Sequence, residues 1–406
     1  MRLLAAYPEL AAHLPWLPLG TFPTPVEPVI DLGEALGCQL WIKRDDRSGP
    51  LYGGNKVRLL EFLLAEAQRR QSQTLLLAGS LGSNFVLATA IYAQTLRPPP
   101  AVRAVLFPRP FSPDLPRKLA LCQHFGAQLH LVPALALLPP ALLWHWLRSP
   151  RPLLLPPGGA APLPCLGYVD AALELAQQVA LGQLPEPHYL FVPLGSGGTA
   201  AGLLAGLRLS GLHTHVVAVR ISSGLIANAA RVARLANQTL ALLAHYIPRL
   251  AVKPLTPHNL IVLPQFLGKG YGAPTPEAQT ALALAKERGH LELDSTYTAK
   301  TLAGLAWYVQ RHQLQEHPIL FWHTLNTVPL PQVTPLPSTV ERFLARHRPG
   351  AGQALSERSM SERAAGARVW TANEGPWPVA GPTLPRAAGA AELPAHLPWP
   401  GPALDS

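Results

Sequence analysis

Short apolar runs alternate with amphipathic stretches along most of this chain, and that alternation restricts its fold more than any other feature. Runs rich in leucine and β-branched residues are typical of buried strands, whereas apolar residues recurring every three or four positions are typical of helices. The expected strands are 39–43, 74–78, 101–107, 128–132, 188–192, 215–220, 259–263 and 319–322. Between them, the expected helices include 56–70, 84–95, 167–181, 199–208, 276–288 and 299–312. This order predicts an α/β fold in which helices cover parallel sheets.

Two sheets account for a chain of 406 residues better than one very wide sheet does. A break at Pro156-Pro157-Gly158-Gly159 marks the expected crossover between them. We therefore predict two three-layer α/β/α domains, a small one over 51–168 and a large one formed by 1–50 with 169–348. The stretch 349–406 is rich in Ala, Pro and Gly without a sustained apolar period, so we expect a disordered tail there.

The composition argues against membrane and secretory classes. Charged residues make up only 14% of the chain, but the longest apolar stretch, 131–157, is cut by prolines and arginines and does not predict a membrane span. The first residues are a poor secretory signal. Three cysteines without metal-ligand spacing argue against a disulfide framework and against a metal site. We expect a cytoplasmic protein.

The formal net charge of +10 raises the alternative of nucleic-acid binding. The basic residues are scattered in small groups, however, with no stripe and no interleaved aromatic side chains. A basic surface attracts small anionic substrates equally well. We therefore expect no nucleic-acid partner.

One lysine follows a glycine pair at the start of an expected helix, in the motif Gly53-Gly54-Asn55-Lys56. A lysine at such a position is usually a solvated surface charge. Here the glycines let the backbone approach a ligand closely, and the helix that follows is apolar. Desolvation lowers the pKa of an amine and frees it for covalent chemistry with a carbonyl group.

A second glycine cluster, Gly195-Ser196-Gly197-Gly198-Thr199, lies between an expected strand and an expected helix. In isolation it is as consistent with a tight turn as with a ligand site. Its backbone N–H groups, the helix N-terminus and the hydroxyls of Ser196 and Thr199 can together bind a phosphate. A reactive amine and a distant phosphate cradle are what a pyridoxal-phosphate enzyme needs.

Polar residues follow other expected strands. Ser83-Asn84 opens a helix, where a simple helix cap is the ordinary interpretation. Tyr297-Thr298 opens another, and His323-Thr324 follows the last strand. Open α/β sheets bind ligands at the carboxyl ends of their strands, so these residues are candidates for one site.

Several of these motifs, in this order, resemble a known family. The chain resembles the pyridoxal-phosphate enzymes that include D-cysteine desulfhydrase and 1-aminocyclopropane-1-carboxylate deaminase, of the tryptophan-synthase-β-like fold. The resemblance is carried by the segments 19–25, 42–46, 53–56, 83–84, 167–169, 195–199, 270–272 and 323–324.

The resemblance implies a role for each matching residue. Lys56 would form the Schiff base with pyridoxal 5'-phosphate, which the large domain would bind, and the segment from Gly195 through Ser196, Gly197 and Gly198 to Thr199 would hold its phosphate. Asn84 would meet the phenolic oxygen and Thr324 the pyridine nitrogen. Ser83 would lie near the substrate carboxylate, and the remaining pocket residues would be Phe85, Tyr271, Tyr297 and Thr298. The expected catalytic groups are Lys56, Ser83, Tyr271 and Tyr297.

The residues at 298 and 324 separate the two activities. The deaminase pattern has Glu and Leu at these positions, whereas Thr298 and Thr324 match the desulfhydrase pattern. We therefore expect a lyase or deaminase acting on a small amino acid, most like a D-cysteine desulfhydrase, working as a homodimer. The alternative activity is that of the cyclopropane deaminase.

The chain also departs from the family pattern. Phe85 replaces the usual histidine after Ser-Asn, and Leu325-Asn326 replaces a glycine pair. These departures keep open a third alternative, a cofactor-binding protein without turnover that serves an interaction role.

Overall fold

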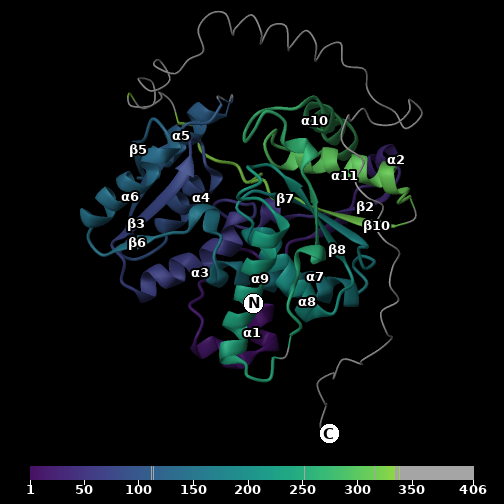
Figure 1. Cartoon of the computed structure of the whole chain (residues 1–406), viewed down its shortest axis with the longest axis horizontal. Coiled ribbons are helices and arrows are strands. Elements are labelled where there is room, and N and C mark those ends of the chain that lie inside the picture. Colours follow the sequence, from purple (N-terminus) through teal and green to yellow (C-terminus); the bar gives the residue numbers. More distant parts are fainter. Residues whose placement is uncertain (111, 113, 251, 316, 334–337, 339–406) are drawn as a thin grey trace, which may run out of the picture. The chain divides into compact units, whose positions relative to one another are not determined.

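Two sheets organise the chain in the computed structural model (Figure 1), which describes residues 1–110, 112, 114–250, 252–315, 317–333 and 338. The predicted tail, 349–406, lies outside the described residues. The proposed division into domains at residues 50 and 168 stays a prediction.

The larger sheet has six strands in the order β1-β2-β10-β7-β8-β9. Their bounds are β1 Val26–Pro28, β2 Gln39–Lys43, β7 Tyr189–Leu194, β8 His215–Arg220, β9 Leu260–Leu263 and β10 Pro318–Trp322. Neighbouring strands are parallel except β1 and β2. Parallel strands buried on both faces are expected to be continuously apolar, and β7 is.

The smaller sheet has four parallel strands in the order β5-β4-β3-β6. Their bounds are β3 Thr74–Ser80, β4 Ala101–Phe107, β5 Gln128–Leu131 and β6 Pro152–Leu154. Ser80 and Phe107, the last residues of β3 and β4, are paired in register. The loops that follow these two strands therefore leave the same edge of the sheet.

Helices cover both sheets. Their bounds are α1 Arg2–Ala6, α2 Ile30–Leu36, α3 Lys56–Arg69, α4 Asn84–Ala93, α5 Leu115–His124, α6 Leu138–Leu147, α7 Pro162–Ala180, α8 Gly198–Ser210, α9 Ala229–Tyr246, α10 Pro276–Gly289 and α11 Thr298–His312. A short 3₁₀ turn, η4, spans Pro157–Gly159. In the described part of the chain, no helix is both long and apolar enough to cross a membrane.

The predicted fold class is confirmed, and the eight expected strands are present within two residues of their expected ends. The short strands β1 and β6 were not expected, because three residues leave too little pattern to recognise. Within the apolar stretch 131–157, helix α6 forms although Pro139 and Pro140 interrupt that stretch. Both prolines lie in its first turn, where no intrahelical N–H bond is lost.

Helix α3 belongs to both hydrophobic cores. Leu59 and Phe62 pack into the core of the six-stranded sheet. Val57, Leu60 and Leu63 pack into the core of the four-stranded sheet. The helix that begins at Lys56 is thus held from two sides.

A buried ionic cluster fixes the register of α3. Arg58, whose side chain is 1% exposed, donates to Asp45 Oδ1 at 2.8 Å and to Glu174 Oε1 at 3.1 Å. Lys43 Nζ lies 2.5 Å from the same Glu174 oxygen. Burial alone would raise the pKa of Glu174, but the charges of Arg58 and Lys43 lower it to about 2. The carboxylate is therefore ionised throughout the physiological range.

We predict that Arg58→Leu lowers the free energy of unfolding by about 3–5 kcal/mol, because it leaves Asp45 and Glu174 buried without their main counter-charge. The matched control is Arg69→Leu in the same helix. Arg69 is 63% exposed, so its bond to Glu66 is screened by solvent and should contribute little to stability. Urea unfolding of the three proteins measures both values. Equal losses in the two variants would contradict the proposed role of the buried cluster.

Candidate active site

The loop before Lys56 fits only glycine at two positions. A Cβ on Gly53 would lie 1.9 Å from the carbonyl oxygen of Asp46. Gly54 has a φ of +82°, and a Cβ there would lie 2.6 Å from the carbonyl oxygen of Thr324. That carbonyl also accepts a hydrogen bond from the backbone N–H of Asn55 at 3.2 Å. The loop is therefore pressed between the segments that follow β2 and β10.

The side chain of Lys56 is partly shielded from solvent. Its Nζ donates to the carbonyl oxygen of Gly158 at 3.1 Å and lies 5.8 Å from the centre of the Phe85 ring. Burial lowers the pKa of Lys56 to about 8. A substantial fraction of this amine is therefore neutral slightly above physiological pH, as nucleophilic attack on an aldehyde requires.

The second glycine cluster joins β7 to α8 through a left-handed residue, Gly197, with a φ of +92°. The first N–H groups of α8 have no intrahelical partner and point out of the helix N-terminus. Asn55 Nδ2 donates to Thr199 Oγ1 at 2.9 Å. A Cβ on Gly158 would lie 2.6 Å from Ser196 Oγ and 4.0 Å from Lys56 Nζ. Lys56 and the second glycine cluster, 195–199, the proposed anion cradle, are therefore neighbours, although Asn55 and Thr199 are 144 residues apart in the sequence.

Two tyrosines stand beside the cradle. The hydroxyls of Tyr271 and Tyr297 share a short hydrogen bond. A Cβ on Gly195 would lie 3.8 Å from the ring of Tyr297. Burial, followed by the effect of Tyr271, raises the pKa of Tyr297 well above its usual value. Tyr297 is therefore a neutral hydroxyl that can donate or accept a hydrogen bond.

The N-terminus of α4 approaches the lysine through Phe85. Ser83 is the N-cap of α4, and it and Asn84 are half-buried. The ring of Phe85 would lie 3.2 Å from a Cβ on Gly159, one residue beyond the acceptor of Lys56. Phe85 thus fills the space between α4 and η4 with an apolar ring. The roles of Ser83 and Asn84 stay predictions.

The two threonines that suggested the desulfhydrase pattern have different surroundings. Thr324 is 8% exposed and contacts the loop before Lys56 through its carbonyl oxygen. The hydroxyl of Thr298 donates to Asp294 Oδ1 at 2.8 Å and accepts from the Asp294 N–H at the same distance. Its side chain thus helps to start α11. Its place in a substrate pocket stays a prediction.

Sequence reasoning missed three contributors. The Pro156–Gly159 break indicates a crossover in the sequence, yet it also supplies the acceptor of Lys56, and its two consecutive glycines signal a backbone with positive φ. Asn55 belongs to a recognisable motif, but its link to Thr199 does not show in that motif. Lys300 Nζ donates to the carbonyl oxygen of Leu267 at 2.8 Å, at the base of the loop that carries Tyr271. No local pattern marks that contact.

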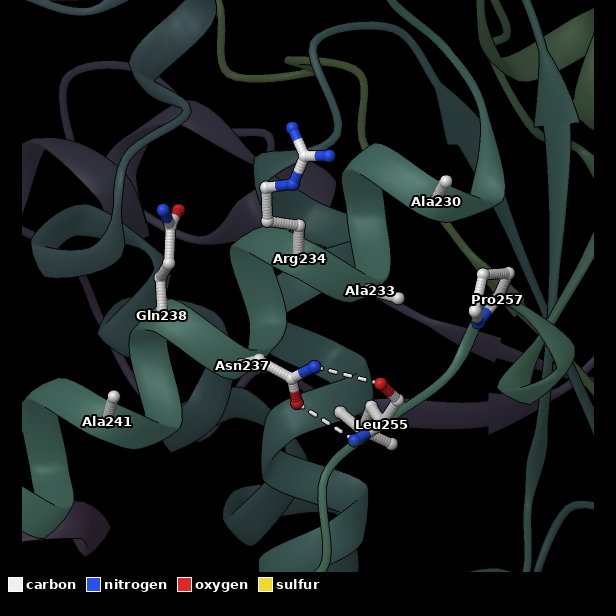
Figure 2. A pocket seen from close by; sticks show the side chains of 8 residues that line it. All are labelled: Ala230, Ala233, Arg234, Asn237, Gln238, Ala241, Leu255 and Pro257. Atoms are coloured by element: carbon white, nitrogen blue, oxygen red, sulfur yellow. Dashed lines mark hydrogen bonds between the residues drawn. The ribbon is translucent and has the colours of Figure 1, made fainter.

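A pocket at the surface of α9 is separate from these residues. It is lined by Ala230, Ala233, Arg234, Asn237, Gln238, Ala241, Leu255 and Pro257 (Figure 2). The Asn237 amide binds the backbone N–H and carbonyl of Leu255, at 2.8 Å each. None of the predicted site residues lines this pocket. The Asn237 amide thus holds the segment at Leu255 against α9.

The arrangement around Lys56 suits a phosphorylated aldehyde. It has an amine of lowered pKa, a glycine cradle at a helix N-terminus and hydroxyls at Ser196 and Thr199. Among the described residues, no group of three or more His, Cys, Asp or Glu side chains could hold a metal ion.

Residues 17–324 match the family model described as "Pyridoxal-phosphate dependent enzyme". The chain belongs to this family. The predicted resemblance, the cofactor and the enzyme class, a pyridoxal-phosphate-dependent lyase or deaminase, are confirmed. The alternative of a binding protein without turnover is not supported.

Curated relatives and a solved structure agree with this assignment. The chain is 35% identical over 321 residues to the nocardicin C-9' epimerase of Nocardia uniformis subsp. tsuyamanensis, covering 77% of this chain and 93% of that protein. It is 33% identical over 325 residues to the D-cysteine desulfhydrase of Klebsiella pneumoniae (strain 342), covering 77% and 94%. A crystal structure of an ACC deaminase homologue superposes with a TM-score of 0.66 at 25% identity, covering 79% of this chain and 94% of that one.

We predict that borohydride treatment of the cofactor-loaded protein fixes the cofactor to Lys56. The reason is that this amine is desolvated and lies beside the cradle. Lys300 is the matched control, because burial also lowers its pKa to about 8 but its amine binds Leu267. Peptide mass mapping should find the label on Lys56 in the wild type and in Lys300→Met, and nowhere in Lys56→Arg. A label on another lysine would contradict the assignment of Lys56 as the lysine that binds the cofactor.

We predict that Gly197→Asp weakens cofactor binding by roughly tenfold or more, about 1.4 kcal/mol or more, because a carboxylate in the cradle repels a phosphate. Gly211→Asp is the control. Gly211 also has a positive φ, +75°, but it caps the opposite end of α8, and a Cβ there would have no atom within 4 Å. Cofactor titration followed by absorbance measures both variants. Similar affinities would mean that the glycines at 195–198 serve only the turn.

Proposed function

We propose that this enzyme is a lyase that acts on a small amino acid, most like D-cysteine, and releases sulfide, ammonia and pyruvate. One observation carries the proposal: the side chains at the positions that distinguish the two activities are neutral hydroxyls, at Thr298 and Thr324. Expulsion of sulfide from the β-carbon needs hydrogen bonding to the leaving group rather than a strong fixed charge. The homodimer and the cytoplasmic location stay predictions.

In this proposal each side chain has a defined task. Lys56 would hold the cofactor aldehyde through its amine and would take the proton from the α-carbon of the substrate. Ser83, with the N-terminus of α4, binds the substrate carboxylate. The bound cofactor supplies the electron sink for loss of the α-proton.

The tyrosines complete the reaction. Tyr271 and Tyr297 face the leaving group and donate a proton to the departing sulfur. Carbon–sulfur bond cleavage leaves an enamine of the former substrate, and water hydrolyses it to pyruvate and ammonia. Thr324 would offer the pyridine nitrogen of the cofactor a hydroxyl without a full negative charge. This limits the lifetime of negative charge on carbon and favours prompt loss of the leaving group.

The second candidate is the opening of 1-aminocyclopropane-1-carboxylate. The superposition with an ACC deaminase homologue favours it. Ring opening requires stronger stabilisation of a carbanion than loss of sulfide does, and position 298 carries a threonine instead of the glutamate of the deaminase pattern.

We predict that D-cysteine is turned over with a kcat/KM at least roughly tenfold above that of 1-aminocyclopropane-1-carboxylate, a difference in activation free energy of ~1.4 kcal/mol. Pyruvate with sulfide and 2-oxobutanoate are measured side by side. Recovered substrate is analysed for inversion, because one relative is named an epimerase. A preference for the cyclopropane acid would replace the first proposal by the second.

Two threonine substitutions, at Thr324 and at the control position Thr239, test the proposed role of the Thr324 hydroxyl. Thr324→Val should lower kcat with D-cysteine about 3- to 10-fold, the value of one neutral hydrogen bond. Thr239→Val is the control, because Thr239 is also buried but donates to Leu235 within α9. Equal rates in the wild type and both variants would remove Thr324 from the mechanism.

A further inference from the structure

A buried guanidinium lies at the edge of the site and has no role in the proposed reaction. Arg109 follows β4 by two residues, at the edge of the sheet from which the β3 loop carries Ser83. Its side chain is 4% exposed. Ligands of open α/β sheets bind at this carboxyl edge.

Arg109 lies between two loops that carry predicted substrate residues. A Cβ on Gly82, next to Ser83, would lie 2.9 Å from Arg109 Nη2. A Cβ on Gly272, next to Tyr271, would lie 3.8 Å from Arg109 Nη1. Both glycines have positive φ, +68° and +80°. The guanidinium therefore occupies the space that two glycine turns leave open.

The charge of Arg109 is poorly compensated. Its Nη2 donates to Ser112 Oγ at 2.7 Å, and its nearest carboxylate oxygen among the described residues, Asp114 Oδ1, is 3.9 Å away. Asp114 is half-exposed and lies closer to Lys118, at 2.5 Å. Arg109 Nε is buried without a hydrogen-bond partner in the described part of the chain. A buried cation in this condition is costly unless an anion joins it.

We propose that Arg109 binds a carboxylate group of the substrate. The inference rests on the proposed function for the location of the substrate, between Ser83 and Tyr271. A guanidinium offers a fork of donors that matches a carboxylate. The carboxylate is either the α-carboxylate, shared with Ser83, or a second one at the far end of a longer substrate. In both cases the substrate is an amino acid with a carboxylate that reaches Arg109 at the carboxyl end of β4.

Ligand binding to the cofactor-loaded enzyme tests this without turnover. The absorbance of the cofactor is titrated with D-alanine and D-alaninamide, which differ in the α-carboxylate, and with D-glutamate and D-glutamine, which differ in a distal one. Arg109→Met should weaken the binding of D-alanine or of D-glutamate by at least about tenfold. The affinity for the amide of the same pair should change little. If only D-alanine loses affinity relative to D-alaninamide, Arg109 binds the α-carboxylate. If only D-glutamate loses affinity relative to D-glutamine, Arg109 binds a distal carboxylate.

Two further variants control for structural effects. Arg109→Lys keeps the charge without the fork and should fall between the wild type and Arg109→Met for the affected acid. Arg103→Met removes an arginine of β4, the strand that precedes Arg109. Arg103 binds Gln128 and Ser149, and its loss should leave all four affinities unchanged. Wild-type affinities for both acids in Arg109→Met, or equal loss for acids and amides, would overturn the proposal. Absence of D-cysteine turnover with acid binding still dependent on Arg109 would contradict only the proposed reaction.

Discussion

The contact of Arg58 with Asp45 and Glu174 is the interaction on which the rest of the site depends. It joins α3 to the segment after β2 and to α7, and it is fully buried. Asp45 also accepts from Tyr168 and Trp322, so its carboxylate connects α7 and β10 to the same point. Lys56 precedes Arg58 by two residues. A helix fixed at Arg58 therefore fixes the first turn, from which the amine of Lys56 extends.

The departure from the family pattern at Leu325-Asn326 has a structural role in holding the loop before Lys56. Asn326 Oδ1 accepts from the backbone N–H of Gly53 and from that of Val328, and its Nδ2 donates to the carbonyl of Val328. The glycine loop before Lys56 is thus tied to the chain beyond β10. Asn326 stands where the family pattern has the second glycine. It provides a hydrogen bond that a glycine at this position could not make.

The sequence was informative where one residue type is required by local geometry. The glycines at 53, 54 and 197 and the strands they follow were recognisable, because close approach and positive φ exclude other residues. Contacts between segments that are far apart in the sequence were not recognisable. Nothing near Gly158 indicates that its carbonyl meets an amine 102 residues earlier, and nothing near Arg109 indicates two glycine turns beside it. Such contacts depend on how the two sheets bring distant loops together, which periodicity does not encode.

Three lysines of lowered pKa show why geometry, rather than acidity, distinguishes Lys56 from the other two. Burial lowers the pKa of Lys43, Lys56 and Lys300 to about 8 in each case. Lys43 is saturated by Glu174, Gln178 and a carbonyl, so its amine is a structural cation.

Lys300 is committed to one carbonyl at the base of the Tyr271 loop, where it orders a neighbour of the site. Lys56 also binds one carbonyl, but that carbonyl belongs to Gly158, which faces Ser196 of the anion cradle. Desolvation makes an amine available for chemistry. In the proposed assignment, the glycine cluster within reach distinguishes Lys56 from the other two amines.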